Sequence, residues 1–168
     1  QILILIIIYM YTKENFIKSL ENEVRIIKHL GSKVTPEMAE YRPSPAQRST
    51  LELMQYLSAV GSGIMKSILD GDTKGWAAYD EFRKTVTVEN FGEKMDAELS
   101  DMKENFSKFT DEDFSKEADF YGKAPVAEHM INILRNFSAY RTQLFLYIKA
   151  NGVNVNTMNL WGGMDASM

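Results

Sequence analysis

Apolar side chains recur at steps of three and four residues along four long segments of the chain. The first segment begins at Lys13, and its apolar positions are Phe16, Ile17, Leu20, Val24, Ile27 and Leu30. Residues at this spacing share one face of an α-helix, so the pattern predicts an amphipathic helix with one buried face. Gly31 is expected to end this helix. Three prolines follow between residues 35 and 46 and predict a loop, because proline lacks the backbone N–H that a helix needs.

The second segment begins with a capping-box pattern, in which Ser49 is followed three residues later by Glu52. Its apolar stripe consists of Leu53, Tyr56, Leu57, Val60, Ile64 and Ile68, and the helix is predicted to end at residues 70–72. Gly61 and Gly63 lie inside it, where glycine costs about 1 kcal/mol relative to alanine. We interpret them as sites of close approach between helices; the alternative is that Gly63 leaves space beside a pocket.

The third and fourth segments continue the same periodicity. The third helix is predicted to start near Thr87 and contains Phe91, Met95, Leu99, Met102 and Phe106. The fourth is predicted to have Pro125 in its first turn, a favoured place for proline, and to end at Asn151 and Gly152. Its stripe consists of Val126, Met130, Ile133, Phe137, Tyr140, Leu144 and Ile148.

Four amphipathic helices in one chain predict an all-α fold, a four-helix bundle with long crossover connections. Residues 72–86 and 107–124 are predicted to be irregular connections, and residues 153–168 a short irregular cover. The sequence shows no sustained period-two alternation that would indicate a large sheet. We therefore expect one bundle domain, residues 10–168, preceded by an apolar extension, residues 1–9.

The extension contains an uninterrupted apolar run, residues 2–8. A helix needs about 20 residues to span a bilayer, so this run is too short. It also lacks a preceding basic region and a following cleavage site, which a signal peptide requires. We expect an upstream extension with Met10 as the natural start; the alternative is an added strand or a partner-binding arm. With no other membrane candidate, a cytoplasmic protein without membrane contact is predicted.

The composition of the chain excludes several kinds of binding site and catalytic site. The 168 residues carry a formal charge of −4, which argues against a nucleic-acid partner bound by broad phosphate neutralisation. There is no cysteine, which excludes disulfides, thiolate metal sites and cysteine nucleophiles. The only two histidines are His29 and His129, so one chain cannot form a three-histidine metal site. Motifs for phosphate loops, dinucleotide folds and zinc proteases are missing.

Three polar side chains are predicted to converge inside the bundle. Asn136 and Tyr140 are four residues apart on the fourth helix, so they share one face, and Tyr56 lies on the inward stripe of the second. One interpretation is that each of the three satisfies a hydrogen bond in the core. The other is that together they line a pocket.

Two motifs are similar to those of the DinB-like (YfiT-like) superfamily. The stretch Glu52-Leu-Met-Gln-Tyr56-Leu resembles that family's Glu-Leu-Leu-x-His-Leu. The stretch Asn136-Phe-Ser-Ala-Tyr140-Arg-Thr-Gln-Leu144 resembles its His-x-x-x-His-Arg-Gly-Gln-Leu, and an Asn-Gly pair follows in both. Arg141 and Gln143 match the family pattern, whereas Thr142 replaces a glycine. The resemblance implies a four-helix bundle, homodimers and a divalent metal held by three histidines.

The resemblance places the three metal ligands at Tyr56, Asn136 and Tyr140, none of which is histidine. A neutral phenol and a carboxamide are weak substitutes for imidazole. We therefore predict a bundle with no metal and no cofactor that binds a small molecule beside Tyr56, Asn136, Tyr140 and Gln143, or that acts as a scaffold homodimer. A third possibility is a pure interaction protein that dimerises through helix faces.

The alternative is an enzyme with an atypical metal site. The resemblance to the superfamily suggests a divalent-metal-dependent hydrolase or a thiol S-transferase that uses zinc or nickel. Its ligands would have to come from other residues, such as Glu128, His129 or Asp165.

Overall fold

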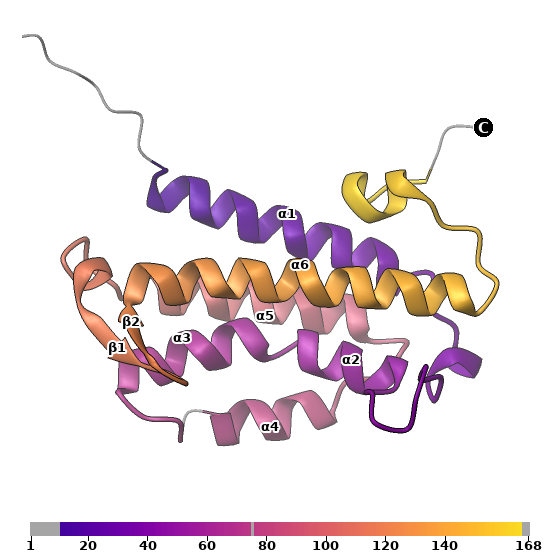
Figure 1. Cartoon of the computed structure of the whole chain (residues 1–168), viewed down its shortest axis with the longest axis horizontal. Coiled ribbons are helices and arrows are strands. Elements are labelled where there is room, and N and C mark those ends of the chain that lie inside the picture. The colour runs from indigo at the N-terminus through magenta and orange to yellow at the C-terminus, as the bar shows by residue number, and fades with distance from the viewer. Residues whose placement is uncertain (1–10, 75, 166–168) are drawn as a thin grey trace, which may run out of the picture.

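The computed structural model describes residues 11–74 and 76–165, and these form a helical bundle (Figure 1). The bundle contains α1 (Lys13–Gly31), α2 (Thr50–Leu57), α3 (Val60–Asp70), α5 (Phe91–Ser107) and α6 (Val126–Ala150). The predicted all-α fold is confirmed, with α2 and α3 together forming the second of the four predicted helices. The predicted extension, residues 1–9, lies outside the described residues.

The second helix is interrupted, so the prediction of one continuous helix is wrong. Its start is as predicted: the Ser49 hydroxyl accepts the N–H of Glu52 at 3.2 Å, and the Glu52 carboxylate accepts the N–H of Ser49 at 2.7 Å. The chain then leaves the helix at residues 58–59, and α3 begins without a side-chain cap of its own.

A carboxylate on another helix accepts hydrogen bonds from the backbone at the start of α3. Oε1 of Glu98, on α5, accepts the backbone N–H groups of Gly61 at 2.8 Å and Ser62 at 3.0 Å, and its Oε2 accepts the Ser62 hydroxyl. Glu98 is only 1% exposed. The first turn of a helix has N–H groups without partners and favours negative charge, so Glu98 acts as the missing cap.

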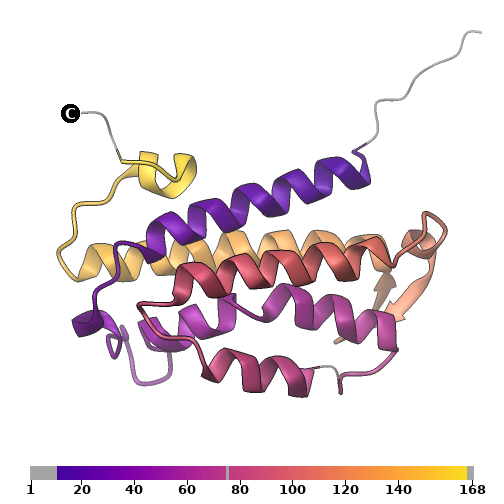
Figure 2. The same cartoon turned by 180° about the vertical axis from the view of Figure 1, so that it is seen from behind.

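Both connections predicted to be irregular contain regular structure. Residues 76–84 form α4 (Trp76–Lys84), which packs against α3 at the edge of the bundle (Figure 2). A short antiparallel hairpin pairs β1 (Glu117–Asp119) with β2 (Lys123–Pro125). Aromatic residues at 76, 79 and 82 were the available signal for α4. The hairpin offered little signal because its strands have three residues each.

Two predicted helix starts shift by a few residues. The third helix begins at Phe91 rather than near Thr87, because Thr87 and Asn90 form a turn first: the N–H of Thr87 donates to the Asn90 side chain at 2.8 Å. Pro125 is the last residue of β2 and directly precedes α6, so it occupies the N-cap position instead of lying in the first turn.

The predicted ends of α1 and α6 are confirmed, at Gly31 and at Asn151. Gly31 does not adopt a left-handed conformation; a Cβ atom at this position would overlap the Phe91 ring. At Gly61 a Cβ would overlap Met102. Gly61 therefore permits close helix approach, as interpreted from the sequence.

The C-terminal segment packs against α1. A π-helical turn, Met158–Gly162, packs on α1, and Arg25 Nη1 donates to the carbonyl of Gly162 at 2.7 Å. The predicted cover is thus present, with a helical turn inside it. None of the helices within residues 11–74 and 76–165 has the length and hydropathy of a membrane-spanning segment.

Candidate ligand-binding site

The structure brings Tyr56, Asn136 and Tyr140 together between α2 and α6. The Asn136 side-chain amide donates to the Tyr56 hydroxyl at 3.1 Å. The rings of Tyr56 and Tyr140 meet edge to face, with centroids 4.8 Å apart and an interplanar angle of 62°. All three side chains are half-buried. The local reason is helical spacing: residues 136 and 140 are one turn apart and face the same residue of α2.

Arg48 is a site residue that the sequence did not indicate. Its guanidinium carbon lies 4.2 Å from the centroid of the Tyr56 ring and 5.5 Å from that of Tyr140. Its Nη1 also donates to the Tyr140 hydroxyl at 3.3 Å. A guanidinium over an aromatic face is attracted by the electrons of the ring. No sequence pattern connects Arg48 with Tyr140, because 92 residues separate them.

Gln143, the fourth predicted residue, lies one step away from this cluster. Its amide donates to the hydroxyl of Tyr147, which donates to the backbone carbonyl of Arg48 at 3.1 Å. Gln143 thus holds the backbone that carries Arg48 and does not contact Tyr56 or Asn136 through a hydrogen bond.

A cavity of about 590 Å³ lies beside Tyr56 and Asn136. It is lined by Arg48, Tyr56, Ile64, Thr73, Trp76, Asp80, Phe120, Tyr121 and Asn136. The rings of Trp76 and Phe120 are nearly parallel, at 21°, with centroids 6.5 Å apart. Two elements missed from the sequence, α4 and the β1–β2 hairpin with its turn, therefore supply the aromatic walls.

Because Gly63 has no side chain, the Trp76 ring can pack against it in this wall. A Cβ atom at Gly63 would lie 3.0 Å from two ring carbons of Trp76, closer than a normal contact. Both interpretations of this glycine thus hold, since it permits close packing and the ring it admits lines the pocket.

Besides the charged Arg48 and Asp80, the site contains uncharged polar groups from Tyr56, Trp76 and Asn136. Burial raises the pKa of Tyr56 above its ordinary value of 10, although the Asn136 hydrogen bond acts in the opposite direction. Tyr56 is therefore a neutral phenol at physiological pH. Within the described part of the chain, Oδ1 of Asn136 and Nε1 of Trp76 are buried without a hydrogen-bond partner. Both residues line the cavity, and each therefore has one polar atom without a partner at the site.

Solved structures share the helical bundle of this chain. A DinB-like protein from Bacillus subtilis superimposes with a TM-score of 0.69, at 14% identity over 83% of this chain and 94% of that chain. A DinB-like protein from Bacillus cereus gives 0.69, at 18% identity over 88% of this chain and 98% of that chain. The chain has the DinB-like fold. This confirms, for the fold, the resemblance seen in the two motifs. No model of a known protein family matches the sequence, and no curated protein matches it either.

The three residues that the motif resemblance suggests as metal ligands do not fit a divalent metal. Zinc and nickel favour imidazole, thiolate or carboxylate donors, whereas Tyr56 and Tyr140 are phenols and Asn136 is an amide. To bind a metal as a phenolate, Tyr56 would have to lose its hydroxyl proton, and its raised pKa opposes this loss. The Arg48 guanidinium over the Tyr56 ring would in addition repel a cation.

The structure does not bring the alternative metal ligands together. Nε2 of His129 lies 3.0 Å from the Ala118 carbonyl oxygen, and Glu128 forms an ion pair with Arg135. Asp165 accepts from Asn159 at 2.9 Å beside α1. In residues 11–74 and 76–165 no group of three or more His, Cys, Asp or Glu side chains could hold a metal.

Proposed function

We propose that this DinB-like chain binds a small polar organic ligand in the cavity beside Tyr56 and Asn136, without a metal. The observation that carries the proposal is a hydrogen-bonded pair, phenol and amide, in the wall of a cavity that three further aromatic rings also line. Ligand pockets of about 300–1,000 Å³ typically combine apolar walls with a few polar groups that fix orientation. The cavity volume of about 590 Å³ lies within this range.

Each part of the cavity has a role in this proposal. The rings of Trp76, Phe120 and Tyr121 bury a flat portion of the ligand, since aromatic side chains contribute large contact areas. The Asn136 carbonyl oxygen and the Tyr56 hydroxyl then bind its polar atoms.

The predicted homodimer and the predicted cytoplasmic location stay predictions.

The binding proposal is tested with the indole N–H signals of the two tryptophans, Trp76 and Trp161. Trp76 lines the cavity, whereas Trp161 packs 5.1 Å from the Arg141 guanidinium on another side of the bundle and serves as an internal reference. Small molecules that raise the melting temperature are titrated into ¹⁵N-labelled protein. We expect them to shift the Trp76 signal and leave that of Trp161 in place.

Two alanine variants on α6 distinguish a side chain of the site from a side chain of the surface. Asn136→Ala is expected to weaken binding about tenfold, because one hydrogen bond contributes about 1 kcal/mol or more. Asn132→Ala, at an exposed residue one turn earlier that does not line the cavity, is the matched control and should leave the affinity unchanged. Equal affinities in both variants, or the failure of every compound to shift the Trp76 signal, would contradict the proposal.

The metal content of the purified protein gives an independent prediction. After dialysis we expect zinc and nickel far below one equivalent per chain, because phenols and an amide beside a guanidinium are poor donors. Elemental analysis of the full chain measures this. Stoichiometric metal that is lost in Asn136→Ala or Tyr140→Phe would instead favour the alternative, a divalent-metal-dependent hydrolase or thiol S-transferase.

A further inference from the structure

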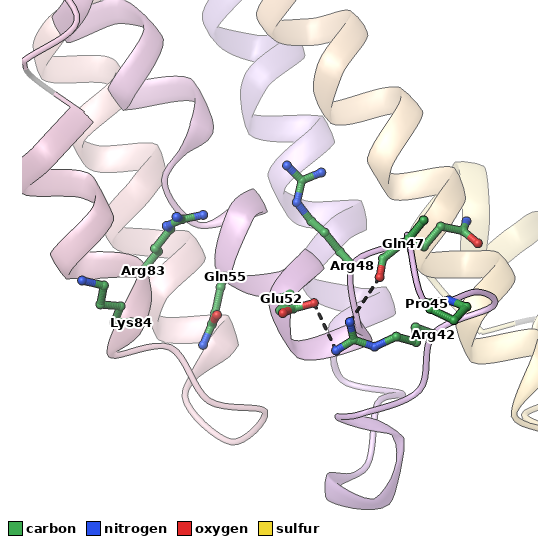
Figure 3. A pocket seen from close by; sticks show the side chains of 9 residues that line it. Arg42, Pro45, Gln47, Arg48, Glu52, Gln55, Arg83 and Lys84 are labelled. Atoms are coloured by element: carbon green, nitrogen blue, oxygen red, sulfur yellow. Dashed lines mark hydrogen bonds and ion pairs between the residues drawn. The ribbon is translucent and has the colours of Figure 1, made fainter.

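Arg48 also lines a second pocket, of about 410 Å³, next to the first (Figure 3). Its lining residues are Arg42, Pro45, Ala46, Gln47, Arg48, Glu52, Gln55, Arg83 and Lys84. Figure 3 shows Arg83 and Lys84 on one side, Arg42 and Arg48 on the other, and Gln55 between them. Four lining residues are basic and one is acidic, in a chain whose formal charge is −4.

Three of the four basic side chains are neutralised by carboxylates. Arg42 pairs with Glu52 at 3.4 Å, Arg83 Nε lies 2.8 Å from Asp80, and Lys84 pairs with Glu81. These pairs leave the pocket polar but add little net charge.

Arg48 differs from these three. Among the described residues it forms no ion pair, and its guanidinium is held by the two tyrosine rings and the Tyr140 hydroxyl. A guanidinium has five N–H donors, and one of them is used here. The planar group is thus positioned by stacking while most of its donors and its full charge remain available at the boundary between the two pockets.

We propose that Arg48 binds an anionic group of the ligand, a carboxylate or a phosphate monoester. This inference rests on the proposed function and specifies its ligand class. Arginine pairs with both anions through two parallel N–H donors, and such charge-assisted bonds are about twice as strong as neutral ones. Arg48 lines both pockets, so an anion held by its guanidinium can extend into the second pocket while the rest of the ligand lies in the first. The planar portion then faces Trp76.

Three probes that share one ring test this orientation: benzyl alcohol, benzoate and phenyl phosphate. Each is titrated into ¹⁵N-labelled full-length protein while the Trp76 and Trp161 indole signals are followed. We expect benzoate, phenyl phosphate or both to bind at least about tenfold more tightly than benzyl alcohol. The ratio between the two acids distinguishes a carboxylate site from a phosphate site. Inorganic phosphate alone is the control for the anion without the ring.

Arg48→Gln is expected to abolish the preference for the anionic probes, and Arg48→Lys to retain only part of it, since an ammonium lacks the planar fork. Lys18→Gln, at an exposed site on α1, removes the same charge and should keep the preference. Arg48 is exposed, and a circular dichroism melt of each variant verifies folding.

The outcomes separate the two proposals. If all three probes shift the Trp76 signal with equal affinity, and Arg48→Gln changes none of them, the anion inference is overturned while the binding function stands. If the anions bind more tightly but Lys18→Gln weakens them as much as Arg48→Gln, the inference is also overturned. If none of the three probes shifts the Trp76 signal, the anion inference is overturned; if the compounds that raise the melting temperature also leave this signal unchanged, the binding function fails as well.

Discussion

Replacing Glu98 with alanine is expected to lower the free energy of unfolding by about 3–4 kcal/mol. The substitution removes the acceptor for the N–H groups of Gly61 and Ser62, which are buried at the start of α3, and it leaves a void in the core. Each buried N–H without a partner costs about 1–3 kcal/mol. Urea unfolding followed by circular dichroism measures the change.

A second glutamate on α5 supplies the control. Glu104 is exposed and forms an ion pair with Lys108 at 2.9 Å, so Glu104→Ala should cost less than about 1 kcal/mol. Similar losses for Glu98→Ala and Glu104→Ala would show that Glu98 does not cap α3.

Glu98 also makes stability depend on pH. Burial raises the pKa of Glu98 to about 7, against an ordinary value of 4.5, and the hydrogen bonds from Ser62 and Gly61 only partly offset this. The folded chain therefore binds this proton more tightly than the unfolded chain does. The free energy of unfolding is expected to fall as pH rises from about 4.5 to about 7, by up to about 3 kcal/mol, and then to level off.

Glu98→Gln isolates this contribution. Glutamine keeps the shape and one acceptor for the backbone N–H groups, and its amide donates to the Ser62 hydroxyl. Denaturant titrations across the same pH range, compared with the unmodified chain, should therefore show a flatter profile for Glu98→Gln. Identical profiles for the two proteins would refute the assignment of this proton to Glu98.

Replacing Arg141 with alanine is expected to cost about 3–5 kcal/mol. Its Nη1 lies 3.0 Å from Oε1 and 2.9 Å from Oε2 of Glu23, which joins α6 to α1, and Arg141 is only 2% exposed. The substitution leaves the Glu23 carboxylate without its ion-pair partner. Burial already raises the pKa of Glu23, and the Arg141 charge, which opposes this rise, would be lost.

Two comparisons test this explanation. The double variant Glu23→Leu, Arg141→Met should regain most of the stability, because well-packed apolar residues often replace a buried ion pair without loss. Lys103→Ala removes the exposed pair between Lys103 on α5 and Glu21 on α1 and should cost less than about 1 kcal/mol. If the double variant is as unstable as Arg141→Ala, the stranded charge is not the cause.

Much of the bundle follows from local pattern. The capping box at Ser49 and Glu52 and the helical periodicity predicted four helices, because the contacts that stabilise a helix lie three or four residues apart. The same spacing indicated that Asn136 and Tyr140 face Tyr56. Helix boundaries shifted where a local turn intervened, as it did at Thr87 and Asn90.

The sequence by itself thus determined the fold class, the approximate helices and the convergence of Tyr56, Asn136 and Tyr140. Only the tertiary structure decided the break between α2 and α3, the position of Arg48 and the aromatic walls from α4 and the hairpin. Each of these depends on residues distant in the chain: Glu98 caps a helix 37 residues away, and Arg48 meets Tyr140 across 92. Such pairs form when helices pack, and periodicity describes one helix at a time.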